Sequence, residues 1–78
     1  MTDPIVVVHW GDAFIDTDDF DLKDVEDTKP VYRKTVGFCI TKNQHGIVLA
    51  TDLYAKKEDG ASGQMFIPWG MVDKWEEI

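Results

Sequence analysis

The chain has a single cysteine, Cys39, among its 78 residues, so it can form no internal disulfide. This favours a protein of a reducing compartment. Because Cys39 lies in an apolar run, we expect it to be a small buried residue and not a nucleophile. No apolar run approaches the roughly 20 residues that span a bilayer, and the N-terminus lacks the pattern of a signal peptide. The sequence therefore predicts a cytoplasmic protein with one small β domain, residues 1–78.

Residues suited to catalysis or to binding soft metals are also scarce. Ser62 is the only serine, and His9 and His45 are the only histidines. Neither histidine has an evident nucleophile partner, and none of the usual zinc-ligand spacings is present. We therefore expect no enzyme activity, no metal site and no cofactor. We expect His9 to be half-buried on a strand and His45 to be solvated in a turn.

Runs of β-branched and aromatic residues predict a mainly β fold. The clearest signal covers residues 36–54, where two such runs flank a polar Asn/Gly-containing break, which is typical of a β-hairpin. Further strands are predicted at residues 4–10, 31–41 and 64–68. Gly37 is expected to mark a bulge or a bend. Residues 71–78 fit either a short helix or a 3₁₀ turn leading into a fifth strand, and we favour the strand because it would cover a sheet edge.

Three stretches carry a resemblance to known proteins: Val36-Gly37-Phe38, Ile47-Val48-Leu49-Ala50, and Phe66-Ile67-Pro68 followed by Gly70-Met71-Val72. With the short strands and the hairpin, they resemble SH3-like or Sm-like small barrels and short uncharacterised proteins of phages and prophages. The resemblance covers roughly residues 5–10 and 36–78 and carries over no catalytic residue. It implies a phage-type accessory protein. The expected fold is a small antiparallel sheet or a partly open five-strand SH3-like barrel, with a long acidic connection after the first strand.

The net charge of −7 arises in the first 30 residues, which carry nine acidic and two basic side chains, whereas residues 31–78 carry six of each. Most of the acidic residues fall in a connection at 12–29, and its five apolar residues predict that it packs on the domain at a few points. Clustered like charge focuses a negative field that speeds encounter with a basic protein. We expect this partner surface to include Asp16, Asp18, Asp19, Asp21, Asp24, Glu26 and Asp27. One version of it is mimicry of DNA, in which carboxylates take the places of phosphates.

Calcium binding is the other chemistry that such a density of carboxylates suggests. The register of an EF-hand loop fails, however. Counted from Asp16, the fifth residue is Phe20, the sixth is Asp21 where a glycine is needed, and the twelfth is Asp27 in place of glutamate. A solvated acidic loop without any ligand remains the simplest alternative to a partner surface.

The three tryptophans complete the set of candidates. Trp10 and Trp75 are expected mainly in the core, whereas Trp69, in a turn between Pro68 and Gly70, is expected to be an exposed anchor for a partner. The sequence thus predicts a non-catalytic protein-binding module.

Two alternatives stay open. One is an Sm-like nucleic-acid-binding module, whose basic candidates are Lys34, Lys42, Lys56 and Lys57 and whose phosphate ligand the acidic connection would repel. The other is a homo-oligomer subunit that pairs through edge strands.

Overall fold

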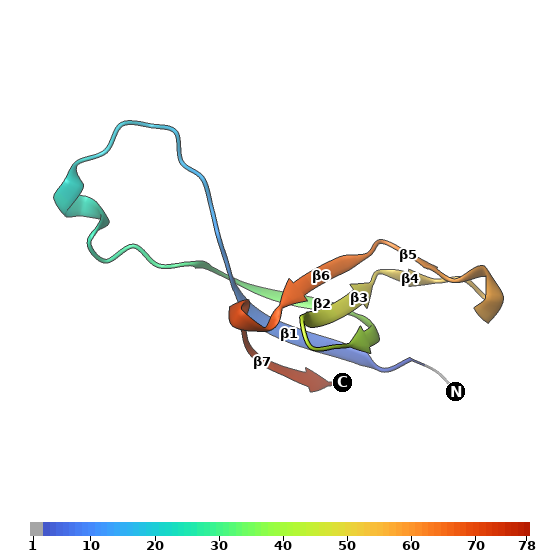
Figure 1. Ribbon diagram of the computed structural model, residues 1–78. Coiled ribbons are helices and arrows are strands. Elements are labelled where there is room, and N and C mark those ends of the chain that lie inside the picture. Colours follow the sequence, from blue (N-terminus) through green and yellow to red (C-terminus); the bar gives the residue numbers. More distant parts are fainter. Residues whose placement is uncertain (1–2) are drawn as a thin grey trace.

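Seven strands form a five-stranded antiparallel sheet and a separate two-stranded ribbon in the computed structural model, which describes residues 3–78 (Figure 1). The sheet has the order β6-β3-β2-β1-β7, and its strands are β1 (Ile5–Asp12), β2 (Val31–Lys42), β3 (Gly46–Ala50), β6 (Met65–Pro68) and β7 (Val72–Glu77). The ribbon pairs β4 (Asp52–Leu53) with β5 (Ala61–Ser62). Three 3₁₀ turns lie between strands: η1 (Leu22–Val25), η2 (Lys57–Asp59) and η3 (Trp69–Met71). The predicted small, mainly β antiparallel fold is confirmed, as an open sheet and not as a closed barrel.

The core lies on one face of the five-stranded sheet because side chains alternate along each strand. On β1, Val6, Val8 and Trp10 are buried, whereas Ile5 on the opposite face is 42% exposed. The buried set is completed from the other strands by Cys39, Ile47, Leu49 and Ile67, with Met65, Trp69 and Val72 packed against it. Cys39 is therefore the buried apolar residue that the sequence predicts.

The predicted hairpin is present as β2 and β3, and Asn43 shapes its turn. The Asn43 side-chain oxygen Oδ1 accepts hydrogen bonds from the backbone N–H groups of His45, at 2.8 Å, and of Gly46, at 3.3 Å. This is the local side-chain-to-backbone bonding that makes asparagine a turn residue. His45 is exposed in the turn and His9 is half-buried on β1, as expected.

The predicted bulge at Gly37 was wrong. Gly37 pairs in register with Val6 on β1, and the register of β2 against β3 shifts instead around Ile40. Gly37 is needed for close approach, because a Cβ there would lie 3.0 Å from the backbone oxygen of Ala50. The glycine therefore allows β2 and β3 to pack closely, and the register shift falls three residues later, at Ile40.

The C-terminal segment is a turn followed by a strand, as favoured from the sequence. After η3, β7 pairs antiparallel with β1 and forms one edge of the sheet. A contact between two strands that are not neighbours, β2 and β7, indicates that the sheet curls. The Nζ of Lys42, at the end of β2, lies 3.9 Å from the centroid of the Trp75 ring on β7. The expectation that Trp75 is a core residue was wrong, since it stays 37% exposed and rests against a lysine at the rim.

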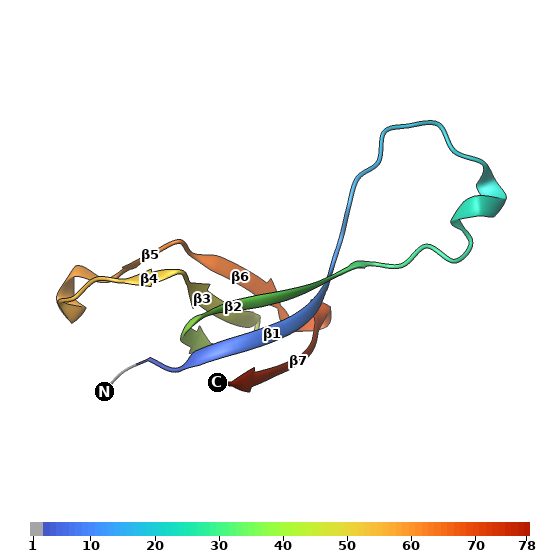
Figure 2. The ribbon, with the colours of Figure 1, turned by 180° about the vertical axis from the view of Figure 1, so that it is seen from behind.

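Two projections make the molecule long. The connection between β1 and β2 leaves the sheet at one end, and the β4–β5 ribbon leaves it at the other (Figures 1 and 2). The molecule measures 53 × 22 × 22 Å, and its radius of gyration is 16.1 Å. A compact chain of this length would have a radius of gyration of about 11.5 Å. Among the described residues, no helix has the length and apolar character needed to cross a membrane.

Candidate functional site

The acidic connection forms an arm, residues 13–30, that stands away from the sheet (Figure 1). Every one of its residues is exposed. Its two ends are held side by side, because Asp12 at the end of β1 pairs with Val31 at the start of β2. The arm is therefore a long loop whose two ends are held by paired strands. The predicted connection, residues 12–29, differs from it by one residue at each end, because Asp12 belongs to β1 and Pro30 still precedes β2.

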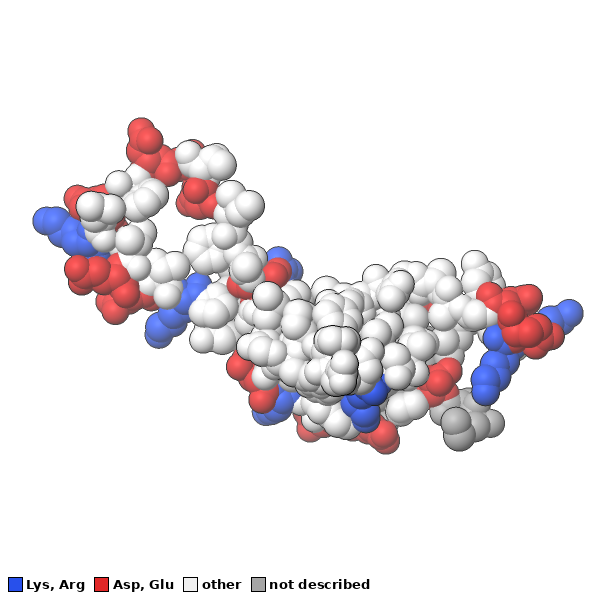
Figure 3. Space-filling view, in the orientation of Figure 1, with Lys and Arg blue, Asp and Glu red and all other residues white. Residues whose placement is uncertain are grey.

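The structure places all seven predicted carboxylates on this arm, with Lys23 and Lys29 as its only cations. Figure 3 shows acidic side chains spread over the arm, with others at the tip of the ribbon and, mixed with basic ones, along the lower edge of the sheet, whereas the middle of the sheet is uncharged on this face. Neither ion pair found among the described residues includes a carboxylate of the arm. Within the part of the chain that the structure describes, no three His, Cys, Asp or Glu side chains are placed to hold a metal ion.

Local hydrogen bonds within the arm define its turns. The Asp16 carboxylate accepts from the backbone N–H of Asp18 at 2.9 Å, and the Asp21 carboxylate accepts from the backbone N–H of Lys23 at 3.3 Å, where it caps η1. Both contacts are short-range side-chain turns of the kind that aspartate favours. No hydrogen bond found among the described residues joins the arm to the sheet, so its shape depends on these turns and on its two ends.

The expectation that the apolar residues of the connection pack on the domain was wrong. Ile15 is 91% exposed and Leu22 is 78% exposed, and the remaining three, Phe14, Phe20 and Val25, are exposed as well. The core cluster is formed by strand residues alone, and no side chain of the arm belongs to it. The arm therefore presents apolar side chains between its carboxylates.

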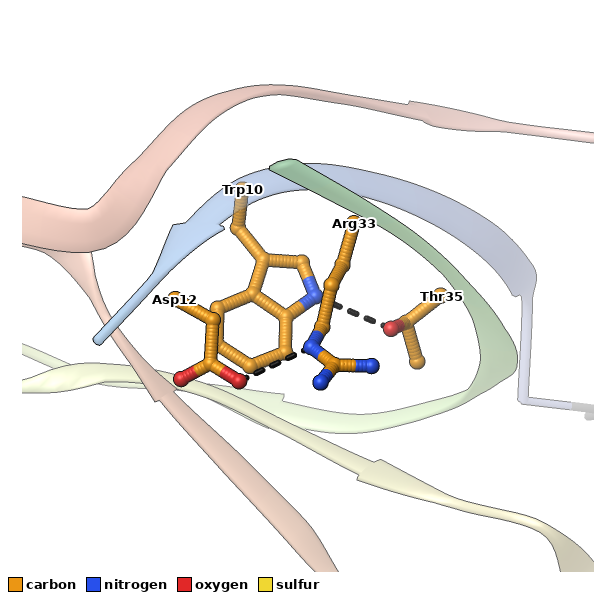
Figure 4. A network of polar contacts seen from close by, with 4 residues as sticks. All are labelled: Trp10, Asp12, Arg33 and Thr35. Carbon is orange, nitrogen blue, oxygen red and sulfur yellow. Dashed lines mark hydrogen bonds and ion pairs between the residues drawn. The ribbon is translucent and has the colours of Figure 1, made fainter. Parts of the chain in front are cut away.

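A small polar network fixes the base of the arm (Figure 4). The Arg33 Nε on β2 donates to the Asp12 carboxylate on β1 at 2.8 Å. Beside it, the buried Trp10 indole N–H donates to the Thr35 hydroxyl at 2.9 Å. Both contacts join β1 to β2, so they hold together the two strands from which the arm emerges.

Trp69 does not join the arm. It lies in η3, is half-buried against the core, and its indole N–H donates to the Asn43 backbone oxygen at 2.6 Å. Its backbone N–H also donates to the His45 oxygen at 3.2 Å. The expectation that Trp69 is exposed was wrong, because its ring packs on the core and its two N–H donors bond the β2–β3 turn. Its role as a partner anchor stays a prediction.

A groove at the root of the arm was missed from the sequence. It has a volume of about 600 Å³ and lies between both ends of the arm and the segment where η3 meets β7. Phe14, Pro30, Tyr32 and Met71 supply its apolar wall, and Asp12, Lys29 and Asp73 supply its charges. Its walls come from residues 11–14, 28–32 and 70–73, and no sequence pattern links these three segments.

Comparison with protein-family models, with curated proteins and with solved structures finds no match for this chain.

Proposed function

We propose that this protein is a non-catalytic binding module, of the phage or prophage type that the sequence resembles, whose acidic arm docks on a basic surface of a partner protein. The observation that carries this proposal is the separation of the arm from the fold. Seven carboxylates lie on a fully exposed loop that adds nothing to the core. Such a loop costs conformational entropy and self-repulsion, and a partner surface is the use that accounts for both costs.

The arm has two kinds of contact group. Its carboxylates attract a basic surface over a distance set by salt, which raises the rate of encounter. The exposed side chains of Ile15, Phe20 and Leu22 lie between these carboxylates and offer apolar contacts that salt does not screen. Binding through the arm is therefore expected to have a part that weakens with salt and a part that does not.

A DNA-mimic-like inhibitor is the form of this function that makes the sharpest prediction. In it, the arm occupies the nucleic-acid site of a basic host protein, so double-stranded DNA and this protein compete for the same surface. The rival function, a nucleic-acid-binding module, has less support because its four lysines are dispersed. Lys34 is in the middle of β2, Lys42 rests on Trp75, and Lys56 and Lys57 are at the tip of the ribbon.

Edge pairing into a homo-oligomer also has little support. The edge strand β7 exposes Asp73, Lys74, Glu76 and Glu77, and the other edge strand, β6, ends in Pro68, which has no N–H to offer. Charged residues and proline on edge strands are features by which proteins avoid such pairing.

The proposal is tested by neutralising the arm. In the variant, the six aspartates of the set are changed to asparagine and Glu26 to glutamine. A matched control changes Asp52, Glu58, Asp59, Glu76 and Glu77, which lie outside the arm, in the same way. Proteins captured from a bacterial lysate by the wild-type chain are identified, and the most abundant basic one is purified for titration. The proposal expects the control to bind it as the wild type does and the arm variant to lose binding.

Salt supplies the second measurement. The screening length is about 10 Å at 0.1 M and about 3 Å at 1 M ionic strength, so the dissociation constant should rise steeply between them for the wild type and little for the arm variant. Added double-stranded DNA should displace the partner if the mimicry form is right. Equal binding by the wild type and the arm variant would refute the proposal, and tight binding of single-stranded RNA at physiological salt would replace it with the nucleic-acid function.

A further inference from the structure

Tyr32 occupies an unusual place at the root of the arm. It lies on β2 opposite Gly11 of β1, so its cross-strand neighbour has no side chain to cover its ring. The ring is 64% exposed and faces both the 600 Å³ groove at the arm root and a smaller groove of about 230 Å³ beside it. A tyrosine in this position is a large amphipathic surface that the chain leaves open.

Asp73 borders the same two grooves from the other side. It is the extra residue where β7 shifts register against β1, between Val72 opposite Trp10 and Lys74 opposite His9. Neither ion pair among the described residues uses its carboxylate, whereas the nearby Asp12 is held by Arg33. The groove thus combines an open aromatic ring with a free carboxylate.

We propose that this groove binds an arginine side chain of the basic partner, with the guanidinium stacked on Tyr32 and paired with Asp73. This inference rests on the proposed function and names a second contact of the same partner beside the arm. A guanidinium suits the site because it is planar, always charged, stacks on aromatic faces and forms paired hydrogen bonds with a carboxylate.

The rest of the groove fits the stem of such a side chain. Phe14, Pro30 and Met71 offer an apolar wall to the methylene groups of an arginine. Of the described residues, Lys29 is the one cation that lines the larger groove, and it is exposed on the arm with a long flexible side chain that can turn to solvent. The smaller groove is also lined by Arg33, whose Nε donates to the Asp12 carboxylate at 2.8 Å, and by Lys34, which is exposed. The arm that forms one side of the groove carries seven carboxylates against two lysines, so the field at the groove favours a cation.

The test is an NMR titration of the full chain with a capped Gly-Arg-Gly peptide and with its counterpart containing citrulline, which has the same shape without the charge. The arginine peptide is expected to give saturable shifts at the amides of Tyr32, Gly70, Met71 and Asp73, and the citrulline peptide none. Tyr32→Ala and Asp73→Asn should each weaken binding roughly tenfold, the size expected for losing one cation–π or ion-pair contact in a partly desolvated site. Tyr54→Ala, which removes a similarly exposed tyrosine from the segment between β4 and β5, should change nothing.

The arm-neutralised variant separates this inference from the proposed function. If the groove binds arginine, that variant still shows saturable shifts at the groove amides, with a weaker affinity because the arm no longer adds to the negative field. Shifts confined to residues 16–27, groove shifts that are absent from that variant even at saturating peptide, or shifts unaffected by Tyr32→Ala would overturn the inference. Partner capture that is lost on neutralising the arm but unchanged by Tyr32→Ala would also overturn it while leaving the proposed function intact. Capture that is unchanged by neutralising the arm would refute the proposed function alone.

Discussion

Shortening the arm is predicted to stabilise the protein. The change replaces residues 14–29 with a four-residue turn of Asn and Gly, and it keeps Ala13, Pro30 and the pairing of Asp12 with Val31. The loop between the paired strands falls from eighteen residues to six. All the removed residues are exposed, so no buried side chain is lost.

The expected gain follows from loop closure. The entropic cost of closing a flexible loop grows as three halves of RT times the logarithm of its length, so this shortening lowers the cost by about 1 kcal/mol. For a domain of this size, that corresponds to a rise of about 4–8 °C in the melting temperature. Removing seven carboxylates and two lysines also relieves repulsion. That electrostatic part acts in the same direction and is suppressed at high salt.

Urea denaturation at high salt, followed by tryptophan fluorescence, to which the buried Trp10 contributes, measures the effect. The full-length arm-neutralised variant is the control, because it removes the charge and keeps the loop length. A loss of more than about 1 kcal/mol in the shortened chain would refute the reasoning. It would mean that the apolar residues of the arm pack on the sheet and that the arm belongs to the folded core.

The remaining predictions concern the sheet, and each is measured on the purified chain. Gly46→Ala should lower the free energy of unfolding by roughly 2 kcal/mol, because the new Cβ overlaps the backbone oxygen of Ile67, and an unchanged midpoint in urea would contradict this. Thr35→Val should cost about 1–2 kcal/mol, since it leaves the buried Trp10 indole N–H without its acceptor. Arg33→Gln should change the unfolding free energy by less than about 1 kcal/mol, because its ion pair is solvent-exposed, and a larger loss would show that the arm base depends on it. Cys39 should resist alkylation in the native state and react on unfolding, and rapid native labelling would place it at the surface.

Much of the sheet was predictable because its signals are local. Asn43 and the glycine after His45 mark the hairpin turn, and the stop at Pro68 ends β6 where the sequence indicates. The terminal strand was also favoured correctly, since an uncovered edge next to β1 needs a partner. These features follow from turn chemistry and from strand propensity within a few residues.

The errors lie where the outcome depends on distant residues. Apolar residues such as Ile15 and Leu22 predict packing only if the chain between the strands folds back on the sheet, and the strands form the core without the arm. Trp69 is placed by the long-range pairing of β6 with β3, which ends at Gly46 opposite Pro68 and so brings η3 beside the β2–β3 turn. Trp75 meets Lys42 of β2, a strand that is not its neighbour in the sheet. The groove at the arm root is harder still, because its three walls come together only in the folded chain.

The elongation of the molecule affects how its association state is measured. A radius of gyration of 16.1 Å is what a compact globular chain of about 190 residues would have, more than twice the length of this one. The Stokes radius of a single copy will therefore exceed that of a compact chain of the same length, and the chain will elute earlier than its mass predicts from a gel-filtration column calibrated with globular standards. Early elution alone is thus no sign of self-association, and the mass should be read from light scattering or sedimentation equilibrium.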